Sequence, residues 1–340
     1  MSFNDDGPKL KSFMATLLNN ACGRVGAKLI FGPKLGASGQ IHFVAEDRYV
    51  SFFNCCFDVN PYGSSLIARN KGLTRLILEK EGFPFLEGEY FSIDHDKYSH
   101  YSQNELNLEI ANFAERIKYP VMVKGADLHR GSCVNRVDGT EELLALLPKV
   151  WSMTPGVIIE KYEDIDSYRI LVFKNEIVAV YAKIPFNIVG DGINRAEELI
   201  EKAKLEGNFT YVETSMYSFN DKVVSNLKKR GYDLKSIIPA GKKVVLLEAA
   251  NISNGATPQD CTKIINKNYR DYVGKIMKFL NLKLAGIDIL TSDITLHPKH
   301  SYILEVNSSP SLESYAKIGE EQEEVIKSLM TDIVLDMKGL

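Results

Sequence analysis

The sequence has no long apolar segment and no surplus of basic residues, and each absence removes a class of protein. Its 340 residues carry 41 Lys and Arg against 44 Asp and Glu, a formal net charge of −3. Nucleic acids and membrane surfaces are bound by clustered basic side chains, so neither partner is expected. The longest apolar runs, such as Val244–Leu247, fall far short of the roughly 20 residues that span a bilayer.

Cysteine is also scarce, and its spacing is uninformative. The five residues are odd in number and show no metal-ligand spacing: Cys22, Cys55, Cys56, Cys133 and Cys261. Residues 1–8 lack the basic start and apolar run of a signal peptide. A reducing, cytoplasmic setting is therefore expected. With 45% apolar and 25% charged residues, the composition is that of a globular protein.

Strand and helix patterns alternate along the chain and predict an α+β (mixed α/β) fold in three parts. Residues 1–65 are expected to form a small N-terminal α/β unit, 66–182 a central lobe, and 183–340 a C-terminal lobe. The segments 169–173 and 177–181 flank a turn and predict an antiparallel hairpin. The polar insertion 208–243 is expected to contain a solvated surface helix rather than a binding patch.

Two apolar strands near the C-terminal end, 285–290 and 302–307, are expected to pair antiparallel. If Asp288 lies opposite Glu305, the alternation of side chains gives the pair one apolar and one polar face. In this register the other pairs are Gly286 with Asn307 and Leu290 with Ile303. The core face would hold Ile287, Ile289, Leu304 and Val306. The other face would hold Asp288, Glu305 and Asn307.

Two interpretations of this polar face remain open from the residues alone. Ionised carboxylates side by side repel each other, and Mg²⁺ would relieve the repulsion because it takes hard oxygen ligands. The groups could equally face solvent on a half-exposed sheet. The turn Ser308-Ser309-Pro310, which would fix the end of the second strand beside a site, favours the metal.

Lys124 ends an apolar strand and leads directly into the loop Gly125–Val134, which contains two glycines. Glycine lets a backbone approach phosphate oxygens closely. The loop matches neither the P-loop nor the dinucleotide-binding pattern, so an ordinary surface turn explains it as well.

Taken in order, these segments resemble those of an ATP-grasp enzyme. The matching segments are Asn70–Pro84, Tyr119–Lys124, Ile158–Tyr162, Gly286–Asp288 and Glu305–Pro310. Within the superfamily, Lys183–Gly192 with the helix start at Glu197, and Ala250–Ala256, resemble the ATP-grasp region of cyanophycin synthetase and of bifunctional glutathione synthetases. The resemblance covers roughly residues 65–318.

The resemblance implies an ATP-grasp fold, in which two α+β lobes clasp ATP, and it implies roles for particular residues. Mg²⁺, for which Mn²⁺ can substitute, would be held by Asp288, Glu305 and Asn307. The residues expected to bind ATP are Lys71, Lys124, His129, Arg130, Gly131, Ser132, Glu160, Lys161, Tyr162 and Asp166. Those expected at the reaction centre are Arg169, Lys183, Asn251 and Ser253. The loop 188–192 would act as a lid.

The sequence departs from the family pattern mainly by losing arginines. Lys183 stands where arginine is usual, and Leu247 and Glu248 replace two further arginines. An arginine fork stabilises a phosphoryl or tetrahedral intermediate in a way that a lysine does not reproduce. Arg169 or Arg130 could take over this role.

The resemblance implies an ATP-dependent carboxylate–amine ligase that joins amino acids or small peptides through an acyl phosphate and releases ADP and phosphate. A macrocyclising ligase acting on a ribosomal precursor peptide is the nearest alternative. The lost arginines also allow a non-catalytic nucleotide-binding regulatory protein, and a kinase would release ADP without an amine. Small-molecule or peptide substrates are the expected partners, and a homodimer is possible.

Overall fold

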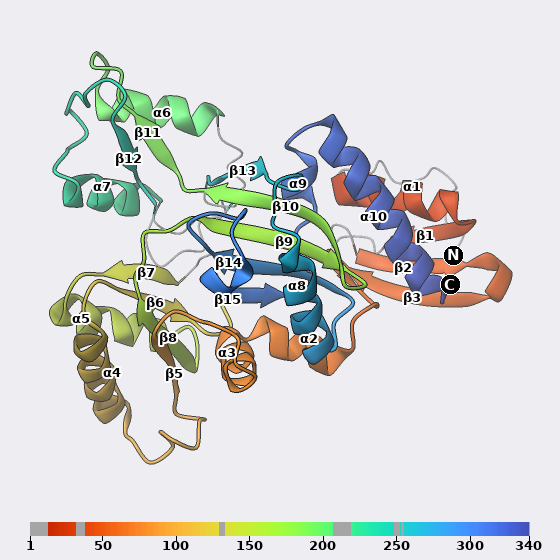
Figure 1. Ribbon diagram of the computed structural model, residues 1–340, viewed down its shortest axis with the longest axis horizontal. Coiled ribbons are helices and arrows are strands. Elements are labelled where there is room, and N and C mark those ends of the chain that lie inside the picture. The colour runs from red at the N-terminus through yellow and green to blue at the C-terminus, as the bar shows by residue number, and fades with distance from the viewer. Residues whose placement is uncertain are drawn as a thin grey trace, which may run out of the picture.

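The computed structural model describes residues 13–31, 38–128, 133–206, 219–247, 252 and 255–339. All strand pairs within these ranges are antiparallel, and they form four sheets (Figure 1). None of the helices in the described part of the chain has the length and apolarity needed to cross a membrane. The predicted α+β class is confirmed.

The central sheet has five strands in the order β13-β10-β9-β14-β15. Its strands are β9 (Ser167–Phe173), β10 (Glu176–Ile184), β13 (Thr257–Asp260), β14 (Leu284–Leu290) and β15 (Tyr302–Asn307). The β9–β10 pair is the predicted hairpin, which is confirmed. The predicted boundary between 182 and 183 falls inside β10. Since β9 pairs with β14, we propose that the whole hairpin belongs to the C-terminal lobe.

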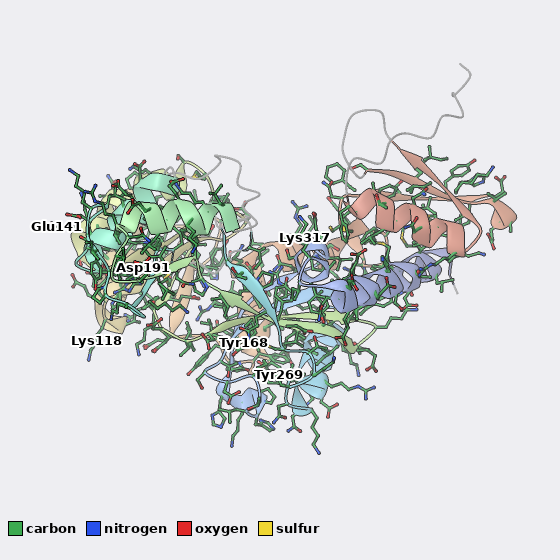
Figure 2. All side chains as sticks on the ribbon, turned by 90° about the horizontal axis from the view of Figure 1, so that it is seen from above. Lys118, Glu141, Tyr168, Asp191, Tyr269 and Lys317 are labelled. Carbon is green, nitrogen blue, oxygen red and sulfur yellow. The ribbon has the colours of Figure 1, made fainter. Side chains whose placement is uncertain are left out.

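Helices cover the two faces of this sheet differently. Helix α8 (Asn268–Phe279) packs on the face that carries Tyr168, and Figure 2 shows Tyr168 and Tyr269 together on that side. The opposite face carries Leu171 and Leu284, which pack under α10 (Glu320–Lys338) beside the short α9 (Glu313–Ala316). Because side chains alternate, Arg169 and Asp288 continue this second face beyond its apolar part.

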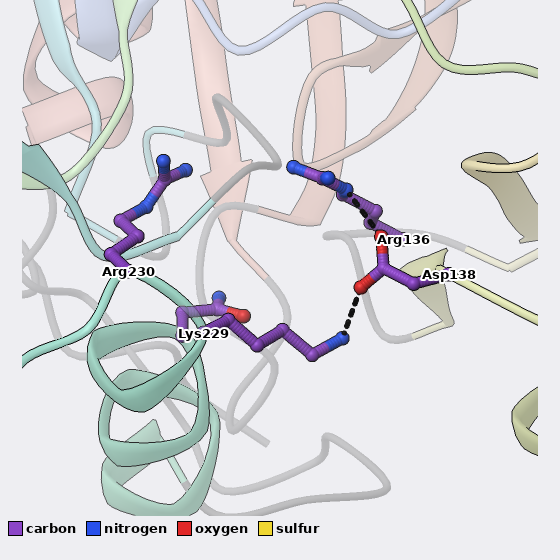
Figure 3. Close-up of a pocket in the computed structure, with 5 residues that line it drawn as sticks. Arg136, Asp138, Lys229 and Arg230 are labelled. Carbon is purple, nitrogen blue, oxygen red and sulfur yellow. Dashed lines mark hydrogen bonds and ion pairs between the residues drawn. The ribbon is translucent and has the colours of Figure 1, made fainter.

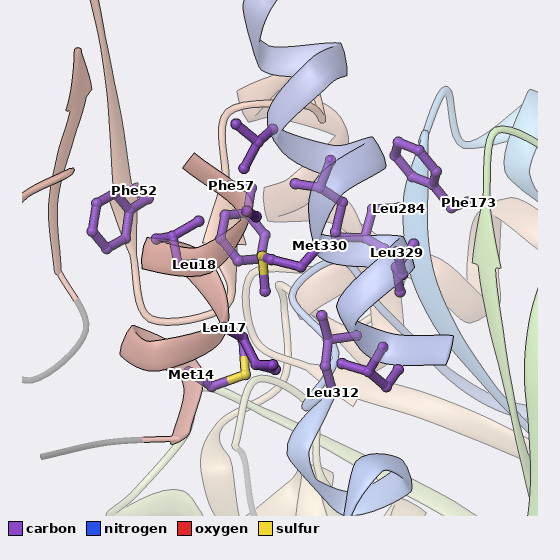
Figure 4. Close-up of a cluster of buried hydrophobic side chains, with 14 of the residues drawn as sticks. Met14, Leu17, Leu18, Phe52, Phe57, Phe173, Leu284, Leu312, Leu329 and Met330 are labelled. Atoms are coloured by element: carbon purple, nitrogen blue, oxygen red, sulfur yellow. The ribbon is translucent and has the colours of Figure 1, made fainter. Parts of the chain in front are cut away.

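The N-terminal part forms a separate sheet, yet it shares a core with the central one. Its elements are α1 (Phe13–Arg24), β1 (Ala27–Phe31), β2 (Ser38–Phe43), β3 (Arg48–Phe53) and β4 (Cys56–Phe57). Leu17 and Leu18 of α1 lie in the same buried cluster as Met330 of α10 and Phe173 of β9 (Figure 4). Burying these apolar side chains together joins the N-terminal part to the central sheet.

The central lobe is a four-stranded sheet in the order β5-β8-β6-β7. Its strands are β5 (Gly88–Ser92), β6 (Val121–Gly125), β7 (Val134–Val137) and β8 (Gly156–Lys161). Helices α4 (Gln103–Ile117) and α5 (Thr140–Trp151) cover one face through a core of their own. Helices α2 (Tyr62–Arg69) and α3 (Lys71–Lys80) connect this lobe to the N-terminal part.

A fourth unit, which we call the lid module, lies between β10 and β13 in the chain. Its elements are β11 (Asn187–Val189), α6 (Ala196–Glu206), α7 (Phe219–Lys229) and β12 (Lys243–Val245). It has its own small core, which includes Ile188, Leu227 and Val244. Helix α7 lies in the stretch for which a surface helix was predicted, but it buries Val223 and Leu227.

Candidate active site

The polar face of β14 and β15 forms the centre of the site. Asp288 lies opposite Glu305 and Gly286 opposite Asn307, so this part of the predicted register is confirmed. The predicted pairing of Leu290 with Ile303 is wrong. The register shifts after Asp288, so that Leu290 faces Tyr302.

The same shift changes the core face of β15. Ile303 is buried beside Ile289, whereas Leu304, predicted for the core, is only half-buried. A β-bulge places an extra residue in one strand and leaves the alternation intact on either side. Glu305 and Asn307 therefore keep their predicted face.

Three cationic side chains surround the two carboxylates. Arg169 lies directly opposite Asp288 on β9. Its Nε donates to Oδ1 of Asp288 at 2.6 Å and its Nη2 donates to Oδ2 at 2.7 Å. Lys183, from β10, donates to the same Oδ2 at 2.8 Å. Two residues expected at the reaction centre thus contact a residue expected to hold the metal.

Glu305 is held by groups from three other positions. Lys71 Nζ lies 3.2 Å from Oε2, Arg169 Nη2 lies 3.5 Å from Oε1, and Asn307 Nδ2 donates to Oε1 at 2.9 Å. Desolvation raises the pKa of Glu305, but Lys71, Arg169 and Lys183 together hold it well below its ordinary value. Desolvation likewise opposes the charge of Arg169, whose pKa is nevertheless raised, chiefly by Asp288. Glu305 and Arg169 are therefore both charged at neutral pH.

Lys71 connects the carboxylates to the predicted phosphate loop. Its backbone N–H donates to the Ala126 carbonyl at 2.7 Å, and its Nζ donates to the Leu128 carbonyl at 2.7 Å. Asn70 caps α3 by accepting from the N–H of Leu73 at 3.0 Å. The cap fixes the start of the helix, so the Lys71 side chain reaches both the loop and Glu305.

Lys124 and Glu160, expected near phosphate and adenine, form a buried ion pair with each other. Arg75 Nη1 lies 3.4 Å from the second oxygen of Glu160, and Arg75 Nη2 also donates to the Leu86 carbonyl at 2.6 Å. Arg75 was not predicted. Its spacing of four residues from Lys71 puts both on one face of α3 and could have revealed it.

The remaining predicted residues lie at the edge of this region or outside the described residues. Lys161 is half-buried, and its Nζ lies 2.8 Å from Glu163. The ring of Tyr162 lies beneath the Arg136 guanidinium at 4.6 Å, and the Asp166 carbonyl accepts from the N–H of Thr291 at 3.1 Å. The predicted residues outside the described ranges are His129, Arg130, Gly131, Ser132, Asn251 and Ser253.

The predicted lid loop is held tightly within the lid module. Residues 187–189 pair with 243–245. A Cβ on Gly190 would lie 2.3 Å from the Pro239 carbonyl oxygen, and Gly192 adopts a φ of +74°. Both positions therefore require glycine, the first for close backbone approach and the second for its conformation.

A pocket of about 360 Å³ lies where the lid module meets the central lobe (Figure 3). Lys229 of α7 contacts Asp138 at 2.9 Å and Glu142 at 3.2 Å across this boundary. The pocket is lined by Arg136, Asp138, Asn226, Lys229 and Arg230. Arg136 lies across β6 from Glu160, so the pocket adjoins the sheet face that carries Lys124.

The donor chemistry of the central site fits Mg²⁺. Within the described ranges, no three His, Cys, Asp or Glu side chains are grouped so that they could hold a metal ion. The oxygen donors here are the carboxylates of Asp288 and Glu305, which face each other, and the amide oxygen of Asn307, two residues further along β15. Hard oxygen ligands of this kind suit Mg²⁺, which usually keeps several positions for water and phosphate oxygens.

The chain has the ATP-grasp fold, and its predicted resemblance to ATP-grasp synthetases is confirmed. The structure is similar to that of a bifunctional glutathione synthetase from Pasteurella multocida, with a TM-score of 0.54 and 19% identity. That likeness covers 94% of this chain and 44% of the other. No family model matches the chain.

Two kinds of curated relative are similar in sequence. Cyanophycin synthetase of Synechocystis sp. is 31% identical over 200 residues, which cover 56% of this chain and 23% of that protein. The glutathione biosynthesis bifunctional protein GshAB of Enterococcus faecalis is 26% identical over 286 residues, 80% of this chain and 36% of the relative. The chain thus spans well under half the length of these relatives.

Proposed function

We propose that this chain is an ATP-dependent carboxylate–amine ligase that forms an amide bond between amino acids or small peptides. The observation that carries the proposal is the convergence of Lys71, Arg169 and Lys183 on the facing carboxylates Asp288 and Glu305. Phosphoryl transfer needs alignment of the reactants and countercharge more than covalent chemistry from the protein. The three cationic side chains of this site supply the countercharge. The similarity to two synthetases supports the same reaction class.

The proposed reaction has two steps. An oxygen of the substrate carboxylate attacks the γ-phosphorus of ATP, the bond from that phosphorus to its bridging oxygen breaks, and ADP leaves. The amine nitrogen of the second substrate then attacks the acyl carbon, phosphate leaves, and the nitrogen loses a proton. Mg²⁺, held by Asp288, Glu305 and Asn307, would neutralise phosphate charge when bound.

The chain's own residues have separate tasks in this scheme. Lys71 and Lys124 would bind phosphate oxygens, and Arg169 and Lys183 would stabilise charge at the reaction centre. The lid loop 188–192 would exclude water, which otherwise hydrolyses the acyl phosphate. Glu160, Lys161, Tyr162 and Asp166 would frame the nucleoside.

The test is an ADP-release assay over pairs of amino acids and short peptides, with mass spectrometry of the products. ADP should form only when an acid and an amine are both present. Glu305→Gln should lower turnover at least about 100-fold, since it removes a proposed metal ligand and countercharge. Glu176→Gln is the matched control, because Glu176 is exposed and paired with Arg270 away from the site, and its turnover should be unchanged.

Other outcomes of this assay would contradict the proposed ligase activity. A regulatory protein would gain thermal stability with Mg·ATP yet release no ADP with any pair. A kinase would release ADP with an acceptor and no amine. Full ligase turnover by Glu305→Gln would refute the assignment of the site.

A further inference from the structure

Asp288 is already surrounded by positive charge from its own chain. Its side chain is 2% exposed, both of its oxygens accept from Arg169, and one also accepts from Lys183. With Lys71 beside Glu305, three cations face two carboxylates. The oxygens that a metal ion would use are therefore the ones that these side chains hold.

The position of Arg169 depends on the neighbouring strand. A Cβ on Gly286 would lie 3.2 Å from Cδ and 3.3 Å from Nε of Arg169. The arginine therefore extends across β14 through space that any other residue would restrict. Its Nη2 lies 2.7 Å from Oδ2 of Asp288 and 3.5 Å from Oε1 of Glu305, which places it between the two acids.

We propose that Arg169 and Lys183 are exchangeable counter-ions of Asp288. They compete with a free divalent cation for its oxygens, and they transfer their N–H donors to phosphate oxygens when the nucleotide and its cation enter together. This inference rests on the proposed function and adds the order of binding, in which the metal ion enters together with the nucleotide. The chain would therefore select the metal–nucleotide complex over the free metal ion.

The charges of the site support this order. Three cations and two carboxylates leave one net positive charge, which disfavours a free divalent cation and favours an anionic polyphosphate. Guanidinium and ammonium groups bind phosphate oxygens as readily as carboxylates, so the exchange replaces one anionic acceptor by another.

The test compares binding of free Mn²⁺ and of ADP to the intact chain. Arg169→Gln should raise the affinity for free Mn²⁺, measured by electron paramagnetic resonance without nucleotide, at least about tenfold, since it removes a like charge beside the metal ligands. Lys183→Met should raise the affinity for free Mn²⁺ severalfold, because Lys183 donates one hydrogen bond to Asp288 whereas Arg169 donates two. Both should weaken ADP binding, measured by calorimetry without metal, at least about tenfold.

Two controls separate this role from a structural one. Arg270→Gln, in an exposed ion pair, should change neither affinity. Arg169→Gln combined with Asp288→Asn should bind free Mn²⁺ more weakly than Arg169→Gln alone, because a ligand is lost. A general disturbance of the site would weaken Mn²⁺ and ADP binding together, whereas the proposed exchange moves them in opposite directions.

Should Arg169→Gln fail to fold, Lys183→Met decides the matter alone, since Arg169 still neutralises Asp288. The proposal is overturned when the folded variants bind free Mn²⁺ no better than the original chain. If the original chain binds Mg·ADP but its folded variants gain no affinity for free Mn²⁺, only this inference is refuted. If the original chain binds no nucleotide at all, the proposed function is refuted.

Discussion

At the scale of single residues, Gly286 is the position where the least change should have the largest effect on the site. In Gly286→Ala the new Cβ would lie 2.9 Å from Cβ of Pro310 and 3.2 Å from Cδ of Arg169. Both neighbours belong to a closely packed region, so we expect unfolding in urea to show a loss of about 1–3 kcal/mol. ADP-release turnover should fall as well, because Arg169 is displaced.

Gly274→Ala is the matched control for this substitution. Gly274 lies inside α8, and a Cβ there would meet nothing closer than Cβ of Asn175 at 3.9 Å. Alanine favours a helix interior over glycine, so this variant should gain about 0.5–1 kcal/mol in the same measurement. Equal stability of the two variants would show that Gly286 does not constrain Arg169.

The sequence predicted those site residues that share a local pattern. Asp288 and Glu305 follow from the alternation of side chains on two strands that the loop 291–301 joins. The partner of Lys124 could not be predicted in this way, because Glu160 lies 36 residues away on another strand. Its pairing depends on the order of strands in the sheet, which a single sequence leaves undetermined.

At the scale of elements, the β9–β10 hairpin was predicted and the irregularities were not. The β9–β10 pair follows from the apolar runs 169–173 and 177–181 on either side of a short turn. The bulge at Leu304 was missed because Ile303 and Leu304 are both apolar, so the pattern fits either residue in the core. Strand β13 (Thr257–Asp260) carries no apolar pattern at all, and only its pairing with β10 reveals it.

Helix α7 allows a test of how the lid module is attached. Lys229 links it to Asp138 and Glu142, and these side chains are between 37% and 46% exposed. Pairs this exposed contribute little to global stability, so Lys229→Met should lower the free energy of unfolding by less than about 1 kcal/mol. Amide hydrogen exchange in α7 and β7 should nevertheless become up to about fivefold faster.

Lys263→Met is the control for this variant. Lys263 lies 2.6 Å from Glu321, and both are exposed, so the substitution removes a similar ion pair away from the lid module. Exchange in α7 should then stay as in the original chain. If Lys229→Met also leaves exchange in α7 unchanged, the lid module is held by other contacts.

At the scale of the whole molecule, the described residues divide their apolar side chains among separate cores. One core joins the N-terminal part, α10 and one face of the central sheet. Another fills the central lobe alone, with Leu147 buried in it and Trp151 packed against it. Separate cores permit separate unfolding transitions, which a two-state description would miss.

The single tryptophan of the chain, Trp151, makes this division measurable. Leu147→Ala removes a buried side chain of the central lobe and should lower that lobe's stability by about 2–4 kcal/mol. Tryptophan fluorescence should then change at lower urea concentration than far-UV circular dichroism. Leu329→Ala, in the core of α10, should reverse this order because it leaves the surroundings of Trp151 intact. If both variants shift both signals equally, the lobes unfold as one cooperative unit despite their separate cores.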